Sequence, residues 1–243
     1  MGSSSPSALK QWLRDLRRPF DRAHAFRTLR AFHASPRTLA DVVDHAIHFG
    51  THGVFRVNSL QQRSEIMGLA DEVAKLEPRI ILEIGTANAG TLFIWSHCAK
   101  TKVISCDLLD KSDVREFYKS FPPAASRCGV VMMSGDSHAP EFRKRVESEL
   151  GGERVDFLFI DGDHTANGVA QDYRDYAGLV RPGGIIAFHD ILESQPLPTN
   201  QVYHFWKKLK PLVEHKEFVN GPNQCGFGIG MIRVPAAGAP KCD

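Results

Sequence analysis

The sequence predicts an α/β fold: a Rossmann-like, doubly wound, mostly parallel seven-stranded sheet with a C-terminal antiparallel hairpin and an N-terminal helical extension. Two observations carry this prediction. From residue 79 onwards, strand-like runs that are apolar throughout alternate with amphipathic stretches, which is typical of a parallel sheet covered by helices on both faces. Near the C-terminus, a loop rich in Gly, Pro and Asn separates two further strand-like runs, which indicates a hairpin.

The N-terminal part of the sequence is helical in pattern. Apolar residues recur at helical spacing on both sides of Pro19, so we expect two amphipathic helices joined at this proline and a third helix over 36–48. Residues 1–57 are expected to cover an active site or a dimer interface. The basic residues of this region are expected to form a solvated helix face; the alternative is that they form a basic docking surface. His45 and His48 stand three positions apart and are either a metal pair or, more commonly for such pairs, structural.

The main domain is expected over 58–235, and residues 236–243 are expected to form a disordered tail. It begins with a helix over 64–76. The expected strands are 79–85, 102–108, 129–136, 155–163, 183–191, 213–219 and 227–234. The helices between and after them are expected at 90–99, 112–119, 139–149, 165–179 and 200–210.

Composition narrows the class of protein. The 243 residues are 42% hydrophobic, which suits one domain with one large core, and the net charge of +2 gives no overall field that would favour nucleic acid. The five cysteines are odd in number and form no C-x-x-C pair, which favours free thiols in a reducing compartment. Neither a secretory signal nor an apolar run of roughly 18 residues is present. We therefore expect a cytoplasmic protein with neither a nucleic acid nor a membrane as partner.

Three strand ends carry the pattern of a nucleotide site. The first strand runs into the turn "LEIGTANAGT", in which Gly85 permits a tight turn and the following helix presents free N–H groups to an anion. The second strand ends in Asp107, which can accept hydrogen bonds from both ribose hydroxyls in dinucleotide-binding and methyltransferase folds alike. The third is followed by Asp136 and Ser137, which could flank an adenine ring; Ser137 serves equally well as a helix N-cap.

The next two strands end in aspartate and histidine residues. "VDFLFIDGDH" brings Asp161, Asp163 and His164 together, and the following strand ends in His189 and Asp190. Because these strands are expected to be neighbours, Asp161, His189 and Asp190 should converge at one rim, where a divalent cation would offset their mutual repulsion. Oxygen-rich ligation with one imidazole suits Mg²⁺, Mn²⁺ or Fe²⁺. The alternative is that Asp161 and Asp163 cap the following helix and that His189 is a hydrogen-bonded core histidine.

The motifs together resemble a known family. "ILEIGTANAGTLFIWS", "GDSH", "VDFLFIDGDHTANGV", "LVRPGGIIAFHDI" and the upstream "QQRSEI" are similar to class I S-adenosylmethionine (SAM)-dependent methyltransferases of the cephalosporin-hydroxylase-like group. Their order also resembles that of the metal-dependent O-methyltransferases related to catechol O-methyltransferase and the macrolide-sugar methyltransferases. The resemblance covers residues 58–234. One departure is Ala89, which stands where this group commonly has a second glycine.

The resemblance implies a role for each matching residue. Glu83 and Gly85 would line the methionine side of the cofactor, Thr91 would lie near its carboxylate, and Asp107 would hold the ribose. The complete cofactor set it implies is Glu83, Gly85, Thr86, Ala87, Gly90, Thr91, Asp107, Asp136, Ser137 and Asp161. The related catechol-type enzymes use a lysine base three positions after the metal aspartate, and His164 occupies that position here. An imidazole with its ordinary pKa near 6.5 suits proton removal at neutral pH, so Asp161 and His164 are the expected catalytic pair.

The expected function is that of a SAM-dependent, divalent-metal-dependent O-methyltransferase. It would act on a hydroxyl of a small molecule, such as a natural product of secondary metabolism, and would form a homodimer or a higher homo-oligomer. One alternative is a SAM-binding protein that uses the cofactor as a scaffold for non-methylating chemistry. An NAD-dependent oxidoreductase is disfavoured by the glycine spacing and by the hairpin. The acceptor itself is not readable from the sequence.

Overall fold

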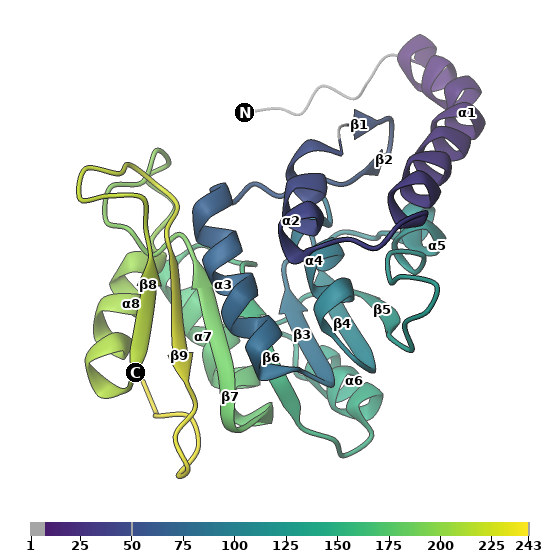
Figure 1. The fold of residues 1–243 in the computed structure, drawn as a ribbon. Coiled ribbons are helices and arrows are strands. Elements are labelled where there is room, and N and C mark those ends of the chain that lie inside the picture. Colours follow the sequence, from purple (N-terminus) through teal and green to yellow (C-terminus); the bar gives the residue numbers. More distant parts are fainter. Residues whose placement is uncertain (1–7, 50, 243) are drawn as a thin grey trace.

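The computed structural model describes residues 8–49 and 51–242, and its strands follow the predicted order. The main strands are β3 (Ile80–Ile84), β4 (Lys102–Asp107), β5 (Gly129–Ser134), β6 (Val155–Ile160), β7 (Val180–His189), β8 (His215–Phe218) and β9 (Ile229–Arg233). They form one seven-stranded sheet in the order β5-β4-β3-β6-β7-β9-β8. Within the sheet β5 to β7 are parallel, and β9 runs antiparallel to β7 and to β8 (Figure 1). The doubly wound fold with a C-terminal hairpin is thereby confirmed.

Helices cover both faces of this sheet, as Figure 1 shows. They are α1 (Ala8–His33), α2 (Leu39–His48), α3 (Arg63–Leu76), α4 (Gly90–Cys98), α5 (Arg115–Tyr118), α6 (Pro140–Leu150), α7 (Ala166–Tyr176) and α8 (Val202–Leu209). The central strands β3 and β6 are buried along their whole length because their side chains face helices on both sides. One core cluster lies on the side of α2, α3 and α4, and a second lies on the side of α6, α7 and α8. A small separate sheet pairs β1 (Thr51–His52) with β2 (Phe55–Arg56).

The expected break at Pro19 is absent, and this prediction was wrong. The helix α1 runs without interruption from Ala8 to His33 with Pro19 inside it. A proline removes one backbone hydrogen bond from the preceding turn, and the bonds on either side of it hold the helix together here. The second half of α1 packs on the domain through the buried residues Ala25, Leu29 and Phe32, and Arg18 of the first half forms an ion pair with Asp113.

The N-terminal helices share the core of the main domain. Val42, Val43 and Ala46 of α2 are buried in the same cluster as the apolar side chains of α4. Thr38 starts α2 with a capping box, in which Thr38 Oγ1 accepts from the Asp41 backbone N–H and the Asp41 carboxylate accepts from that of Thr38. His45 stacks on the Phe32 ring at 4.0 Å, and burial lowers the pKa of His45 to about 4. This histidine therefore has the structural role that was the alternative to metal binding.

Residues 236–243 were expected to form a disordered tail, but the structure shows packing contacts in this segment. The Tyr173 hydroxyl of α7 donates to the Pro240 carbonyl at 2.8 Å, and Cys242 is 5% exposed. These contacts could not be read from the small residues of the segment; residue 243 lies outside the described part of the chain. All five cysteines are free thiols, as predicted. Among the described residues, no helix is both long enough and apolar enough to cross a bilayer.

Candidate functional site

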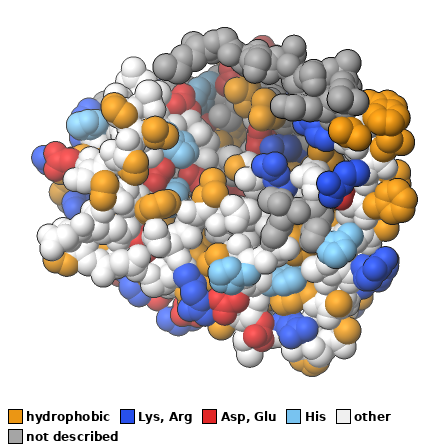
Figure 2. All heavy atoms as spheres, turned by 90° about the horizontal axis from the view of Figure 1, so that it is seen from above, with side chains coloured by type: hydrophobic (Ala, Val, Ile, Leu, Met, Phe, Trp, Pro, Cys, Tyr) orange, Lys and Arg blue, Asp and Glu red, His pale blue; other side chains and the backbone are white. Residues whose placement is uncertain are grey.

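The carboxyl ends of β3 to β7 open into a cavity of about 620 Å³. Every one of these strand ends contributes to its wall, together with residues from the segment before α3 and from the β8–β9 loop. Figure 2 looks down on this edge of the sheet and shows acidic and histidine side chains gathered among apolar ones. This is the edge at which ligands bind in open α/β sheets.

The glycine turn after β3 is shaped by close backbone packing. Gly85 has a φ of 103°, and a Cβ there would lie 2.1 Å from the Asp161 carbonyl oxygen, so only glycine fits. Gly85 and Ala87 line the cavity, whereas Thr86 and Thr91 are buried and Gly90 packs on the backbone of Ser59. Ala89 stands where the resembled family commonly has a glycine. It holds a left-handed φ of 58°, which a glycine would adopt without strain.

Glu83 lies beneath the turn and outside the cavity lining. It is fully buried, and Ser105 Oγ donates to its Oε2 at 2.5 Å. Burial raises the pKa of Glu83 to about 7, although the hydrogen bonds from Ser105 and Thr91 act in the opposite direction. Thr86 Oγ1 lies 2.6 Å from Ser105 Oγ and extends the same network. The structure thus places Glu83 and Thr86 where they support the turn from below.

The second and third strand ends form one side of the cavity. Asp107 accepts from the backbone N–H groups of Ala87 and Leu109, both at 2.8 Å, and this fixes its carboxylate at the wall. Asp136 and Ser137 also line the cavity. Ser137 does not cap α6, whose N-cap is Ala139; its hydroxyl donates instead to the buried Asp172 carboxylate at 2.7 Å.

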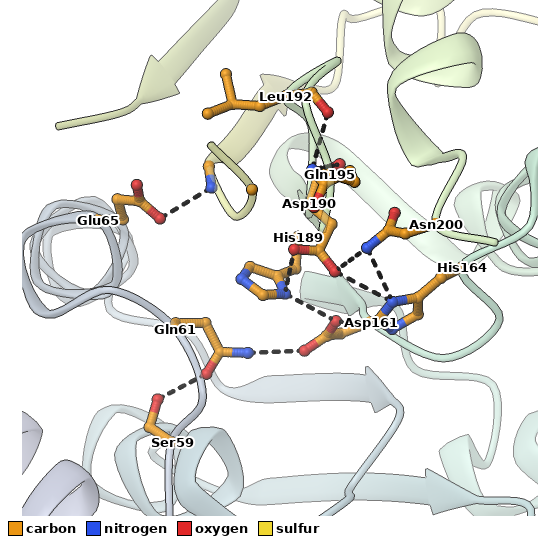
Figure 3. A network of polar contacts seen from close by, with 12 residues as sticks. Ser59, Gln61, Glu65, Asp161, His164, His189, Asp190, Leu192, Gln195 and Asn200 are labelled. Carbon is orange, nitrogen blue, oxygen red and sulfur yellow. Dashed lines mark hydrogen bonds and ion pairs between the residues drawn. The ribbon is translucent and has the colours of Figure 1, made fainter. Parts of the chain in front are cut away.

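The fourth and fifth strand ends bring two carboxylates and two imidazoles together (Figure 3). Asp161 Oδ1 lies 3.2 Å from His189 Nδ1 and 3.4 Å from His164 Nε2. Asp190 Oδ2 lies 3.1 Å from His164 Nδ1, and its Oδ1 lies 3.5 Å from His189 Nδ1. One ligand atom each of Asp161, His164 and Asp190 lies within 4.8 Å of the others. The four side chains are hereafter called the Asp/His cluster.

The charged groups of the Asp/His cluster shift one another's pKa values. Burial alone would raise the pKa of Asp161, but His189 and His164 outweigh it and lower that pKa to about 2. Hydrogen bonds to Asp161 and Asp190 raise the pKa of His164 to about 10, and the Asp161 charge raises that of His189 against the effect of its burial. A protonated His164 therefore lies beside Asp161 and Asp190 at neutral pH. Oxygen and nitrogen donors without sulfur fit a divalent cation in the place of that proton.

Neighbouring side chains fix the Asp/His cluster. Asp190 has a left-handed φ of 63°, and Asn200 Nδ2 donates to its Oδ2 at 2.5 Å. Asp163 points to the start of α7, where it accepts from the Thr165 backbone N–H at 2.9 Å. The cap of α7 is Thr165, so Asp163 supports the residue that caps the helix and does not cap it itself. Asp161 faces the two histidines and does not cap the helix either.

Three residues of the site were not predicted as site residues from the sequence. Gln61 donates to Asp161, Asn200 donates to Asp190, and Phe227 lines the cavity beside His189. All three lie in loops, which carry no periodic pattern. The available signals were the "QQ" pair before α3 and the glycines on both sides of Phe227.

We expect the stability of the protein to reveal the buried state of Glu83. Its folded pKa of about 7 lies above its ordinary value of 4.5, so the folded state keeps a proton that the unfolded state loses. The contribution of Glu83 to stability should therefore fall as pH rises from about 4.5 to 7 and level off above that. Urea unfolding of the wild type and of Glu83→Gln at pH 5, 6 and 8 would measure this. The Gln variant should gain relative stability with rising pH; a constant difference would contradict the prediction.

The comparisons with known proteins agree with this architecture. Residues 82–191 match the model of a family described as a methyltransferase domain. An O-methyltransferase from Bacillus cereus in complex with SAH has a TM-score of 0.57 at 17% identity, covering 82% of this chain and 93% of its own. TomG from Streptomyces achromogenes, an O-methyltransferase of tomaymycin synthesis in complex with SAM, has a TM-score of 0.58 at 14% identity, covering 83% and 91%.

A third solved structure adds a metal. MycE, a methyltransferase of the mycinamycin pathway in complex with Mg, SAH and mycinamycin VI, has a TM-score of 0.50 at 17% identity, covering 70% of this chain and 48% of MycE. No protein of curated function matches the chain. The identities are low, so these structures establish the fold alone. The family match and the fold confirm the resemblance seen in the sequence: residues 82–191 match a family described as a methyltransferase domain, and the chain has the class I methyltransferase fold.

Proposed function

We propose that the protein is a SAM-dependent, divalent-metal-dependent O-methyltransferase that acts on a hydroxyl of a small molecule. The observation that carries this proposal is the Asp/His cluster in the wall of the cavity formed by the nucleotide-type strand ends. A cofactor site alone requires no second set of carboxylates and imidazoles at neighbouring strand ends. A methyltransferase that must ionise a hydroxyl can use such a set to bind a cation and to accept the proton.

The cofactor is proposed to lie along the strand ends from β5 to β3. Asp136 and Ser137 would face the adenine end, Asp107 the ribose, and the turn at Gly85 and Ala87 the methionine part. Solved structures of the same fold contain SAH or SAM, which supports a cofactor of this kind. The cavity volume of about 620 Å³ is in the usual range for small-molecule sites.

The metal is proposed to bind Asp161, His189 and Asp190. His189 Nδ1 lies between the two carboxylates, within 3.5 Å of an oxygen of each, and its side chain is 5% exposed. MycE was crystallised with Mg, which supports a cation in this fold. When bound, SAM supplies the electrophilic methyl group and the cation supplies positive charge that favours an ionised acceptor hydroxyl.

His164 is proposed as the base. Its side chain is 40% exposed and lines the cavity, so it is the more accessible of the two imidazoles. His164 Nδ1 lies 3.1 Å from Asp190 Oδ2 and 3.3 Å from Asn200 Nδ2, and its Nε2 lies 3.4 Å from Asp161 Oδ1. A cation bound to these carboxylates would oppose protonation of His164, and the neutral imidazole would then be able to accept the proton of the acceptor hydroxyl. Leu60, Leu109 and Phe227 give the cavity an apolar wall, which suits an acceptor with an apolar body.

A second copy of the chain is the proposed partner of α1. Trp12, Leu13, Leu16 and Phe20 on its first half are 47–77% exposed, and apolar side chains gather at the right-hand edge of Figure 2, where α1 lies. An apolar helix face of this kind is typical of an interface between subunits. Phe20→Glu should lower the molar mass measured by light scattering, with Leu212→Glu as the control at an exposed apolar residue outside α1. An unchanged mass would contradict the interface.

The nucleotide end of the site is tested by cofactor binding. Asp107→Ala removes the carboxylate proposed to hold the ribose, so the affinity for SAH should fall by about 1.5 to 3 kcal/mol, the cost of losing a charged hydrogen bond. Titration calorimetry with SAH, SAM and NAD would measure it. Tighter binding of NAD than of both SAM and SAH would rule out the methyltransferase proposal.

The metal and the base are tested by separating binding from turnover. Chelation should abolish methyl transfer to a panel of phenolic acceptors, followed as SAH formation, and leave SAH affinity nearly unchanged. His164→Ala should lower kcat by about 10² to 10⁴, and the loss should shrink at high pH, where the acceptor ionises unaided. His204→Ala, at an exposed histidine outside the cavity, is the control. Full turnover by the chelated protein would show that the carboxylates are structural.

A further inference from the structure

The segment 58–62 joins the glycine turn to the Asp/His cluster. The Asn58 backbone N–H donates to the Asn88 carbonyl at 3.1 Å, and Asn58 forms a parallel bridge with Ala89. A Cβ on Gly90 would lie 2.1 Å from the Ser59 nitrogen, so the segment rests directly on the start of α4. Leu60 and Gln61 then turn into the wall of the cavity.

Gln61 is held at both ends of its amide group. It is 8% exposed; its Nε2 donates to Asp161 Oδ2 at 2.8 Å, and its Oε1 accepts from Ser59 Oγ at 2.6 Å (Figure 3). An ionised carboxylate can only accept hydrogen bonds, so the amide nitrogen must face Asp161. The amide oxygen then faces Ser59, whose hydroxyl must donate. The hydrogen-bonding chemistry therefore allows only one orientation of this side chain.

This contact makes the two oxygens of Asp161 unequal. Oδ2 is engaged by Gln61, whereas Oδ1 faces His189 at 3.2 Å and His164 at 3.4 Å. We infer that Gln61 is a positioning residue that makes Asp161 present a single oxygen, Oδ1, to the cation. The inference rests on the proposed function, since it needs the cation that the function invokes.

The chemistry of glutamine suits this role. Its amide donates a hydrogen bond without adding charge, so Asp161 keeps its full negative charge for the cation. A lysine there would neutralise the carboxylate, and a second carboxylate would repel it. Groups that orient a metal ligand in this way commonly contribute 10- to 100-fold to metal affinity.

The test measures the affinity for Mn²⁺ and the affinity for SAH separately, by titration calorimetry on the full chain. Gln61→Ala should weaken Mn²⁺ binding by about 10- to 100-fold and change SAH affinity, measured without metal, by less than about twofold. Ser59→Ala keeps the Gln61 side chain and removes only its orienting donor, so it should weaken Mn²⁺ binding to a smaller extent. Gln62→Ala is the matched control, because this adjacent glutamine makes no side-chain capping bond.

The outcomes separate this inference from the proposed function. If the wild type binds SAH but no Mn²⁺, the metal part of the proposed function fails. If the wild type binds Mn²⁺ and Gln61→Ala binds it equally well, the positioning role is overturned while the proposed function stands. A parallel loss of Mn²⁺ and SAH affinity in Gln61→Ala would also overturn it, because it would show a general structural role. Should that variant fail to fold, Ser59→Ala decides by the same comparison.

Discussion

The repulsion between Asp161 and Asp190 is the constraint on which the site depends. Parallel strands β6 and β7 end at the same edge of the sheet and bring the two carboxylates to one place, where both are largely shielded from solvent by the wall of the cavity. Buried charges of the same sign persist only when opposite charges offset them. His164, whose pKa is raised to about 10, provides that offset beside both carboxylates, and a divalent cation could provide it equally well. The most strongly shifted acid and base of the cavity wall are therefore also the best candidates for binding and chemistry.

Backbone strain collects at the same edge. Ala87, Ala89, Asp190 and Phe227 all have left-handed φ values and all lie in the turns that carry or border the cavity. Such conformations are costly for residues other than glycine and persist where the surrounding structure fixes them. Here the fixing contacts are visible: Asp107 holds the Ala87 N–H, and Asn200 holds the Asp190 carboxylate. The buried sheet beneath supplies the rigidity that these turns lack.

The N-terminal helices contribute differently along their length. The second half of α1 and the apolar face of α2 complete the core over α4, whereas the first half of α1 leaves large apolar side chains exposed. Removal of residues 1–57 would therefore uncover core residues such as Phe93, which packs against Phe32 and His45, so point variants are the suitable probes of this region. The segment that follows α2 links this helical layer to the cavity through Gln61.

The sequence by itself determined the sheet, the order of its elements and the edge at which the site lies. Apolar runs mark strands, and the last residues of parallel strands must share one edge, so Asp107, Asp161 and Asp190 could be placed there without coordinates. Only the tertiary structure decided which neighbours these carboxylates have. Gln61 lies 100 residues before Asp161, and the loop that holds Asn200 carries no periodic pattern. Tertiary contacts also decided the course of α1 past Pro19 and the packing of residues 236–242, because a local pattern states a preference that long-range packing can override.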